Sequence, residues 1–284
     1  MKAPADYTIR TMIRSEVDIA IEWAAAEGWN PGLDDAECFY RADPEGFLIG
    51  SIGNKPVASI SVVSYGESFA FLGLYIVCQE YRGKGLGLRI WNAGLEKLEG
   101  RTIGLDGVVA QQDNYRKSGF NLAYRNIRFQ GTGGEASAGH ERILKLSEIP
   151  FDEIHSYDNT FFPEERQAFL KCWINRKNST ALGIINHNRL AGYGVIRSCR
   201  SGYKIGPLFA DSADLAETLF CALKSSVPEG STVFLDIPEV NPAALDLVRR
   251  YSMTVVFETA RMYKGRIPEL PLNRIFGVTS FELG

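Results

Sequence analysis

The residues best suited to chemistry form one short run, Arg82 to Gly87, which reads Arg-Gly-Lys-Gly-Leu-Gly. The run follows an apolar segment that ends at Val77, and leucines and a tryptophan at helical spacing come after it. Glycines let the backbone approach a phosphate closely, and the first N–H groups of a helix have no partner inside it. Strand, glycine loop and helix N-terminus in this order predict an anion cradle, with a pyrophosphate as the expected ligand.

Two other phosphate motifs do not fit this run, because it contains neither Gly-x-Gly-x-x-Gly nor Gly-Lys-Ser/Thr. The spacing of Arg82, Gly85 and Gly87 behind a strand instead resembles the acyl-CoA signature of the GNAT superfamily of N-acetyltransferases. Family members splay the sheet open at this strand, which implies that its backbone serves the carbonyl and the pantetheine. The resemblance thus implies a set of cofactor-binding residues: Ile76, Val77, Arg82, Gly83, Lys84, Gly85, Leu86, Gly87, Asn114 and Lys117.

A second segment, Tyr115 to Phe120, carries the same resemblance through its Tyr-x-x-x-Gly-Phe pattern. Residues 108–110 are expected as a short buried strand before it, with Gly119 ending the helix between. In the family this tyrosine often protonates the departing thiolate, so the resemblance makes Tyr115 the catalytic acid; the alternative is that its ring only packs a helix on the sheet. Many members carry asparagine where this chain has Val108, which leaves cofactor contacts to Gln111, Gln112 or Asn114.

The acceptor side is defined less sharply. Glu67, at the start of the strand before the loop, and the acidic group of Asp34, Asp35 and Glu37 are candidates for the general base, although such carboxylates are more often solvated. Trp29 beside several acids suits a cationic, partly apolar amine, or else anchors a turn. The expected acceptor-binding residues are Trp29, Asn30, Asp34 and Tyr75.

Composition limits the class of protein. The chain has 284 residues, 45% hydrophobic and 23% charged, and a net charge of -3, which gives no general field for nucleic acid. We expect a cytoplasmic protein without a membrane span, with reduced cysteines and no metal site. Cys78 lies near the loop and is a less favoured alternative as a nucleophile. The three histidines, His140, His155 and His187, support neither a zinc site nor a hydrolase triad.

The remaining sequence must position these residues. A first strand at 7–10 precedes a helix through Ala26, for which Ser15 and Asp18 resemble a capping box. A hairpin of residues 47–52 and 57–64 and a strand at 69–77 follow. This order is similar to that of a GNAT domain over about residues 6 to 130, and the small polar residues after it read as a linker.

The second half repeats strand and helix at lower fidelity. Residues 204–209 and 233–237 read as strands, and Asn241-Pro242 marks a helix start. The whole chain resembles a tandem GNAT protein of the α/β (α+β) class, in which each domain has a mixed, mostly antiparallel sheet flanked by helices. We expect domains at 1–130 and 141–284 with a linker at 131–140. The second domain is expected to be a degenerate copy that either walls the acceptor pocket or forms an interface, and residues 276–281 are expected to form a strand that ties it to the first.

The resemblance implies an N-acyltransferase that moves an acetyl group from acetyl-CoA to a primary amine of a small or amino-acid-like molecule by direct attack, with another short acyl-CoA as the alternative donor. The alternative is a GNAT-fold regulatory module that binds acyl-CoA without turnover. Aminoacyl transfer from tRNA is disfavoured by the acidic balance. We expect one acyl-CoA per chain, a small-molecule partner, no nucleic acid or membrane, and a homodimer as one option.

Overall fold

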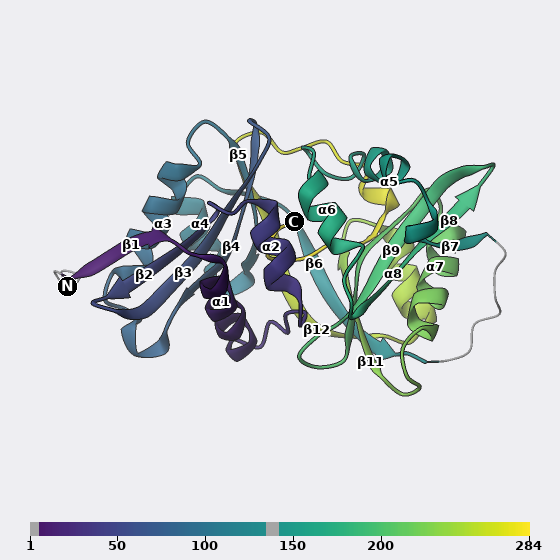
Figure 1. Cartoon of the computed structure of the whole chain (residues 1–284), viewed down its shortest axis with the longest axis horizontal. Helices are drawn as coiled ribbons and strands as arrows, with labels where there is room; N and C mark the ends of the chain where they lie inside the picture. Colours follow the sequence, from purple (N-terminus) through teal and green to yellow (C-terminus); the bar gives the residue numbers. More distant parts are fainter. Residues whose placement is uncertain (1–5, 135–141) are drawn as a thin grey trace.

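The computed structural model describes residues 6–134 and 142–284, which form two halves built around one continuous sheet (Figure 1). The thirteen strands are β1 (Tyr7–Thr11), β2 (Phe47–Ile52), β3 (Lys55–Tyr65), β4 (Phe69–Val77), β5 (Thr102–Val108), β6 (Asn121–Thr132), β7 (Ile143–Lys145), β8 (Ser179–Asn186), β9 (Arg189–Ser198), β10 (Tyr203–Ala210), β11 (Thr232–Pro238), β12 (Thr254–Lys264) and β13 (Ile275–Gly277). The helices are α1 (Arg14–Ala26), α2 (Asp35–Ala42), α3 (Leu86–Lys97), α4 (Gln112–Lys117), α5 (Phe151–Asp158), α6 (Gln167–Trp173), α7 (Ala213–Ser225) and α8 (Pro242–Arg250).

Strands of the two halves alternate at the middle of the sheet. The order is β1-β2-β3-β4-β5-β12-β6-β11-β10-β9-β8-β7, so β12 of the second half lies between β5 and β6 of the first, and β6 pairs with β11 (Figure 1). Among the described strands, only β4–β5 and β10–β11 pair in parallel. The sheet is therefore mixed and mostly antiparallel, as expected, and its hydrogen bonds run unbroken across the two halves.

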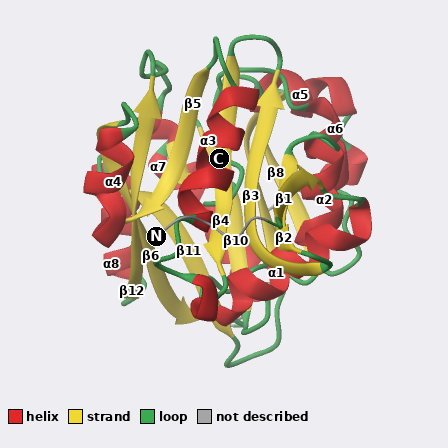
Figure 2. Ribbon diagram, turned by 90° about the vertical axis from the view of Figure 1, so that its left-hand side faces the viewer, coloured by secondary structure: helices red, strands yellow, loops and turns green. Residues whose placement is uncertain are grey.

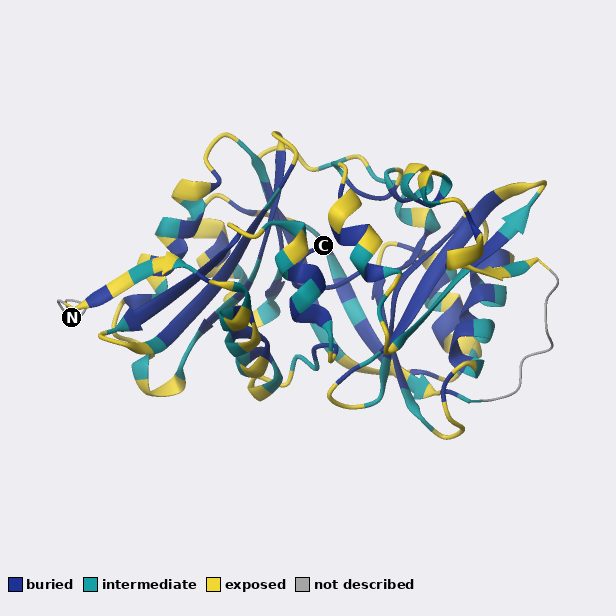
Figure 3. Cartoon of the chain, viewed as in Figure 1, coloured by how far each residue is buried: buried dark blue, intermediate teal, exposed yellow. Residues whose placement is uncertain are grey.

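Alternating side chains on the strands build a separate core on each face. On β4, Phe69 and Phe71 join a buried cluster that contains side chains of α1, α2 and α6, whereas Ala70 and Leu72 join the cluster under α3. The first of these clusters draws on both halves. Figure 2 shows helices on both sides of the sheet, and in Figure 3 the strands are mainly buried while the helices combine buried and exposed residues.

Several expected elements are confirmed. Strand β4 spans residues 69–77, the hairpin β2–β3 forms, α1 ends at Ala26, and Gly119 follows α4 with φ +91°. The side chain of Asn241 caps α8 by accepting bonds from Ala243 N at 3.1 Å and Ala244 N at 3.2 Å.

Other expectations are wrong. Helix α1 begins at Arg14, and its first turn is closed by Glu16, which accepts a bond from Ile13 N at 3.0 Å, so Ser15 and Asp18 form no capping box. Residues 109–111 form a 3-10 turn, because β5 already ends at Val108.

The expectation of reduced cysteines is wrong for one pair. Cys38 on α2 and Cys172 on α6 form a disulfide with a Cα–Cα distance of 5.3 Å. The pair is separated by 134 residues, so spacing along the chain gave no sign of it. Of the expected linker, residues 131–132 belong to β6, and residues 135–140, including His140, lie outside the described residues. The domain boundaries stay predictions.

Candidate functional site

The sheet opens between β4 and β5. The two strands pair in parallel only from Phe69–Thr102 to Leu72–Leu105. Directly after the last pair, Leu74 has φ +44°, an unusual conformation for a residue other than glycine, and the register of β3 with β4 shifts. Ser59 holds this bulge by donating a bond from Oγ to Leu74 O at 2.8 Å. The bulge turns β4 away from β5 and leaves a wedge between them.

A cavity of about 580 Å³ occupies this wedge. Its walls come from β4, β5, the glycine loop and the start of α3, and also from β12 and the last residues of the second half. Lining residues of the first half include Trp29, Tyr75, Ile76, Val77, Arg82, Gly83, Gly85, Gly87, Asp106, Gln111 and Tyr115. Those of the second half are Phe257, Thr259, Phe281 and Glu282.

The glycine loop has the geometry of an anion cradle. Gly83 and Gly85 have φ of +73° and +79°, and a Cβ on Gly87 would lie 2.6 Å from the Tyr75 hydroxyl. No side chain in the described part of the chain caps the N-terminus of α3, so the N–H groups of its first turn stay available to a ligand. Arg82 is held beside them by a bond from Nε to Val77 O at 2.9 Å and by an ion pair with Glu27. These residues fit the diphosphate of an acyl-CoA.

Tyr115 presents a protonated phenol to the same cavity. Its side chain is only 9% exposed and stacks on Trp91, with the ring centroids 5.5 Å apart. Burial, with a smaller effect from Tyr75, raises the pKa of Tyr115 to about 12. A Cβ on Gly107 would overlap the Tyr115 ring, so this glycine makes room for it. Near neutral pH the phenol keeps its proton and can donate it.

The structure brings together most of the expected cofactor residues, but four lie outside the cavity lining. Leu86 is fully buried against Tyr7. Lys84 donates a bond to Glu80 O at 2.8 Å. Asn114 and Lys117 lie on the exposed side of α4, where Lys117 Nζ donates a hydrogen bond to Asn114 Oδ1 at 3.2 Å. Gln111, one of three alternatives left open by the sequence, lines the cavity instead.

The candidate bases also lie elsewhere. Glu67 is exposed on the turn between β3 and β4, at the end of β4 remote from the glycine loop, and is absent from the cavity lining. Asp34 accepts a bond from Asn178 Nδ2 at 2.8 Å, and Glu37 pairs with Arg14 and Arg41. The expected acceptor residue Asn30 bonds to Ser201. Cys78 is also outside the lining, and burial raises the pKa of its thiol.

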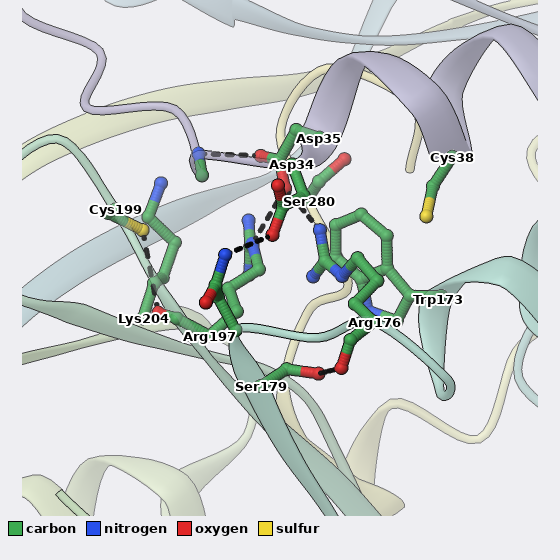
Figure 4. Close-up of polar contacts among 12 residues, drawn as sticks. Asp34, Asp35, Cys38, Trp173, Arg176, Ser179, Arg197, Cys199, Lys204 and Ser280 are labelled. Atoms are coloured by element: carbon green, nitrogen blue, oxygen red, sulfur yellow. Dashed lines mark hydrogen bonds and ion pairs between the residues drawn. The ribbon is translucent and has the colours of Figure 1, made fainter.

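Asp35 belongs to a buried charge cluster between the halves (Figure 4). Its Oδ1 accepts bonds from Arg176 Nη1 at 2.5 Å and from Arg197 Nε at 3.1 Å, and its Oδ2 accepts one from Gly32 N at 2.8 Å. Burial alone would raise the pKa of this carboxyl, but Arg197 and Arg176 hold it well below its usual range. A carboxylate fixed in this way is not available as a base.

The sequence left open whether the second half lines the acceptor pocket or forms an interface, and it did not predict which residues of this half reach the cavity. Phe257, Thr259, Phe281 and Glu282 reach the cavity only because β12 pairs with β5 and the last residues pack against β4. No motif marks these positions. The described residues contain no group of three or more His, Cys, Asp or Glu side chains placed to hold a metal ion.

The corresponding opening of the second half is filled. Strands β10 and β11 pair in parallel only up to Ile205 and Leu235, and β13 then pairs with β10 at Leu208 and Phe209. The strand expected at 276–281 is therefore wrong, because the strand is Ile275–Gly277 and pairs within its own half. Helix α7 is capped by Ser212 Oγ, which accepts a bond from Leu215 N at 3.4 Å. Asp211, the residue before this cap, accepts a bond from the Tyr157 hydroxyl and pairs with Arg274.

Comparison with known proteins gives matches in both halves. Residues 15–120 match the acetyltransferase (GNAT) family, and residues 154–277 match an acetyltransferase (GNAT) domain. A holothin acyltransferase from Pseudoalteromonas sp. (strain SANK 73390) is 32% identical over 284 residues, which covers 100% of this chain and 97% of the relative. An uncharacterized N-acetyltransferase of Bacillus subtilis is 26% identical and matches 69% of this chain and 70% of its own length.

Solved structures share the fold. A putative acetyltransferase from Pyrococcus horikoshii superimposes with a TM-score of 0.85 at 23% identity, covering 100% of this chain and 98% of the other. A tandem GNAT protein from the clavulanic acid biosynthesis pathway gives a TM-score of 0.65 at 12% identity, covering 92% and 100%. No helix in the described part of the chain is long and apolar enough to cross a membrane.

Proposed function

The chain belongs to the GNAT family of N-acyltransferases, with two GNAT domains in tandem, and on that premise we propose that it acetylates a small-molecule amine from acetyl-CoA. The acceptor nitrogen attacks the thioester carbonyl directly, without a covalent enzyme intermediate. The acceptor we propose is a primary amine on a small or amino-acid-like molecule. A relative that spans the whole chain is named a holothin acyltransferase, which supports a small-molecule acceptor over a protein.

The observation that carries the proposal is the uncapped start of α3 beside the opened sheet. The glycine loop offers backbone N–H groups to the diphosphate, and β4 loses its β5 partner after Leu72, which frees its edge near Ile76 and Val77 for the pantetheine and the carbonyl. Bound acyl-CoA supplies the activated thioester. Tyr115, in the same cavity, gives its proton to the sulfur as the C–S bond breaks.

The aromatic lining of the cavity supports an amine with an apolar body. Trp29, Phe257 and Phe281 contribute to it from three separate segments. A cationic or aromatic amine gains favourable contacts with such rings. Of the lining carboxylates, Glu27 and Asp106 are paired with arginines, which leaves Glu282 to favour a basic acceptor.

We assign the second half no cofactor site of its own, in keeping with its expected degeneracy. Its helix α7 begins with a side-chain cap and Asp214 in the first turn, and its sheet opening holds β13. A capped N-terminus that carries acidic residues disfavours a pyrophosphate.

A thiol-release assay with acetyl-CoA and a panel of primary amines tests the proposal. We expect free CoA to appear only when an amine is present. Primary arylalkylamines such as 2-phenylethylamine and tryptamine should be among the best acceptors. A protein that binds acetyl-CoA but releases no thiol with any amine would instead be the regulatory module considered as the alternative.

A further inference from the structure

The last residues of the second half are fixed against the cavity of the first. Val278 N donates a bond to Asp236 O at 2.8 Å, and the Tyr65 hydroxyl donates one to Leu283 O at 3.1 Å. Gly73 on β4 lacks the Cβ that would overlap the carbonyl of Glu282. The chain therefore passes directly along the bulged part of β4, and this contact places Glu282 in the cavity wall.

The carboxylates that line the cavity are Glu27, Asp106 and Glu282, and they differ in their partners. Glu27 pairs with Arg82. Asp106 is held on both oxygens by Arg261, at 2.8 and 2.6 Å. Glu282 is only 4% exposed, and among the described residues its carboxylate has no hydrogen bond or ion pair. It is the lining carboxylate that is free to take a proton.

Burial and the surrounding charges act on the Glu282 carboxyl in opposite directions. Burial raises the pKa of the carboxyl above its ordinary value, and Asp35 on α2 acts in the same direction. Lys204 on β10, Arg128 on β6 and Arg197 on β9 oppose this rise. A carboxylate whose pKa lies above its usual value is a better proton acceptor near neutral pH.

We propose that Glu282 is the general base of the transfer, so that the second half completes the active site of the first. This inference rests on the proposed function. As the amine nitrogen bonds to the thioester carbon, Glu282 takes one proton from that nitrogen, the C–S bond breaks, and the sulfur takes a proton from Tyr115. Solvent then returns a proton to Tyr115 and removes one from Glu282, which leaves the amide and the free thiol.

The test compares Glu282→Gln with the wild-type protein in the thiol-release assay with acetyl-CoA and the best amine of the panel, from pH 5 to 9. We expect kcat to fall about 10²- to 10⁴-fold and the acid limb of the wild-type profile to disappear. Glu282→Asp should recover part of the rate and show an acid limb again. Glu96→Gln, on the exposed side of α3, serves as the matched control and should keep the wild-type profile.

Calorimetric titration with CoA and thermal unfolding of each variant separate catalysis from folding. The inference predicts wild-type CoA affinity and stability for Glu282→Gln. An unchanged kcat with an unchanged acid limb would overturn it, as would a loss of rate that follows a loss of CoA affinity or stability. If only Glu67→Gln lost the acid limb, the base would be Glu67. A wild-type protein that releases no thiol with any amine would refute the proposed function itself.

Discussion

Two properties decide which acids and bases of this chain are available for proton transfer in the cavity: whether the side chain is buried there, and whether another residue already holds it. Tyr115 and Glu282 are buried in the cavity wall, and burial raises the pKa of both. Glu67 is exposed on a turn, and Asp35 is fixed by two guanidinium groups. Residue type and position along the chain do not distinguish these cases, because the partners come from distant segments.

Replacing Tyr115 by phenylalanine removes the proton donor and keeps the ring on Trp91. We expect kcat to fall about 10²-fold while the dissociation constant for CoA changes little, because water can partly replace a general acid. Steady-state thiol release and calorimetry on the same protein measure both quantities. Tyr40→Phe, on α2 and outside the cavity, is the control. An unaltered kcat would leave Tyr115 with a packing role.

Local sequence signals predict where the helices and strands begin and end, but they do not predict which distant segments pair. The bounds of β4, the cap of α8 and the glycine that ends α4 were predictable, because each depends on a few neighbouring residues. The glycine loop was identified for the same reason. The position of β12 between β5 and β6, the disulfide and the cavity residues of the second half depend on pairing across more than a hundred residues, and no short motif encodes it.

Replacing Gly85 by valine tests the cradle. A branched side chain at φ +79° is strained, and its methyl groups obstruct close approach of a phosphate. We expect acyl-CoA affinity to fall at least about tenfold, equivalent to about 1.4 kcal/mol, as measured by calorimetry. Arg82→Ala should have a smaller effect, because its charge supplements the backbone donors.

Gly100→Val is the matched control for this strain. Gly100 has φ +86° and open space around it, and it follows the far end of α3. It should lose stability to a similar degree and keep wild-type affinity. Equal affinity in a folded Gly85→Val protein would place the phosphate site elsewhere.

Across the whole molecule, buried ion pairs join the two halves. Arg128 pairs with Asp236 and Asp106 with Arg261, and Asp35 pairs with both Arg176 and Arg197. Each pair links a residue before the expected linker to one after it. In Figure 4 the ring of Trp173 lies beside the two guanidinium groups that hold Asp35, at 3.7 and 4.6 Å from its centroid. With the shared sheet and the disulfide, these pairs predict that the halves unfold together.

Replacing Asp35 by asparagine should weaken this junction. Removing the charge leaves two buried guanidinium groups without their anion, which costs about 3–5 kcal/mol. Urea unfolding under conditions that keep the disulfide measures the change. Asp18→Asn, in an exposed pair with Arg14, should change stability by less than about 0.5 kcal/mol. A similar small loss for Asp35→Asn would mean that the cluster does not hold the halves together.

Calorimetric titration of acetyl-CoA into the whole chain tests the central claim that two GNAT domains form one active site. The claim predicts saturation at one equivalent per chain, because α7 is capped and β13 fills the second opening. The single binding event should disappear in Gly85→Val. Two equivalents per chain, or one equivalent that survives this substitution, would contradict the account.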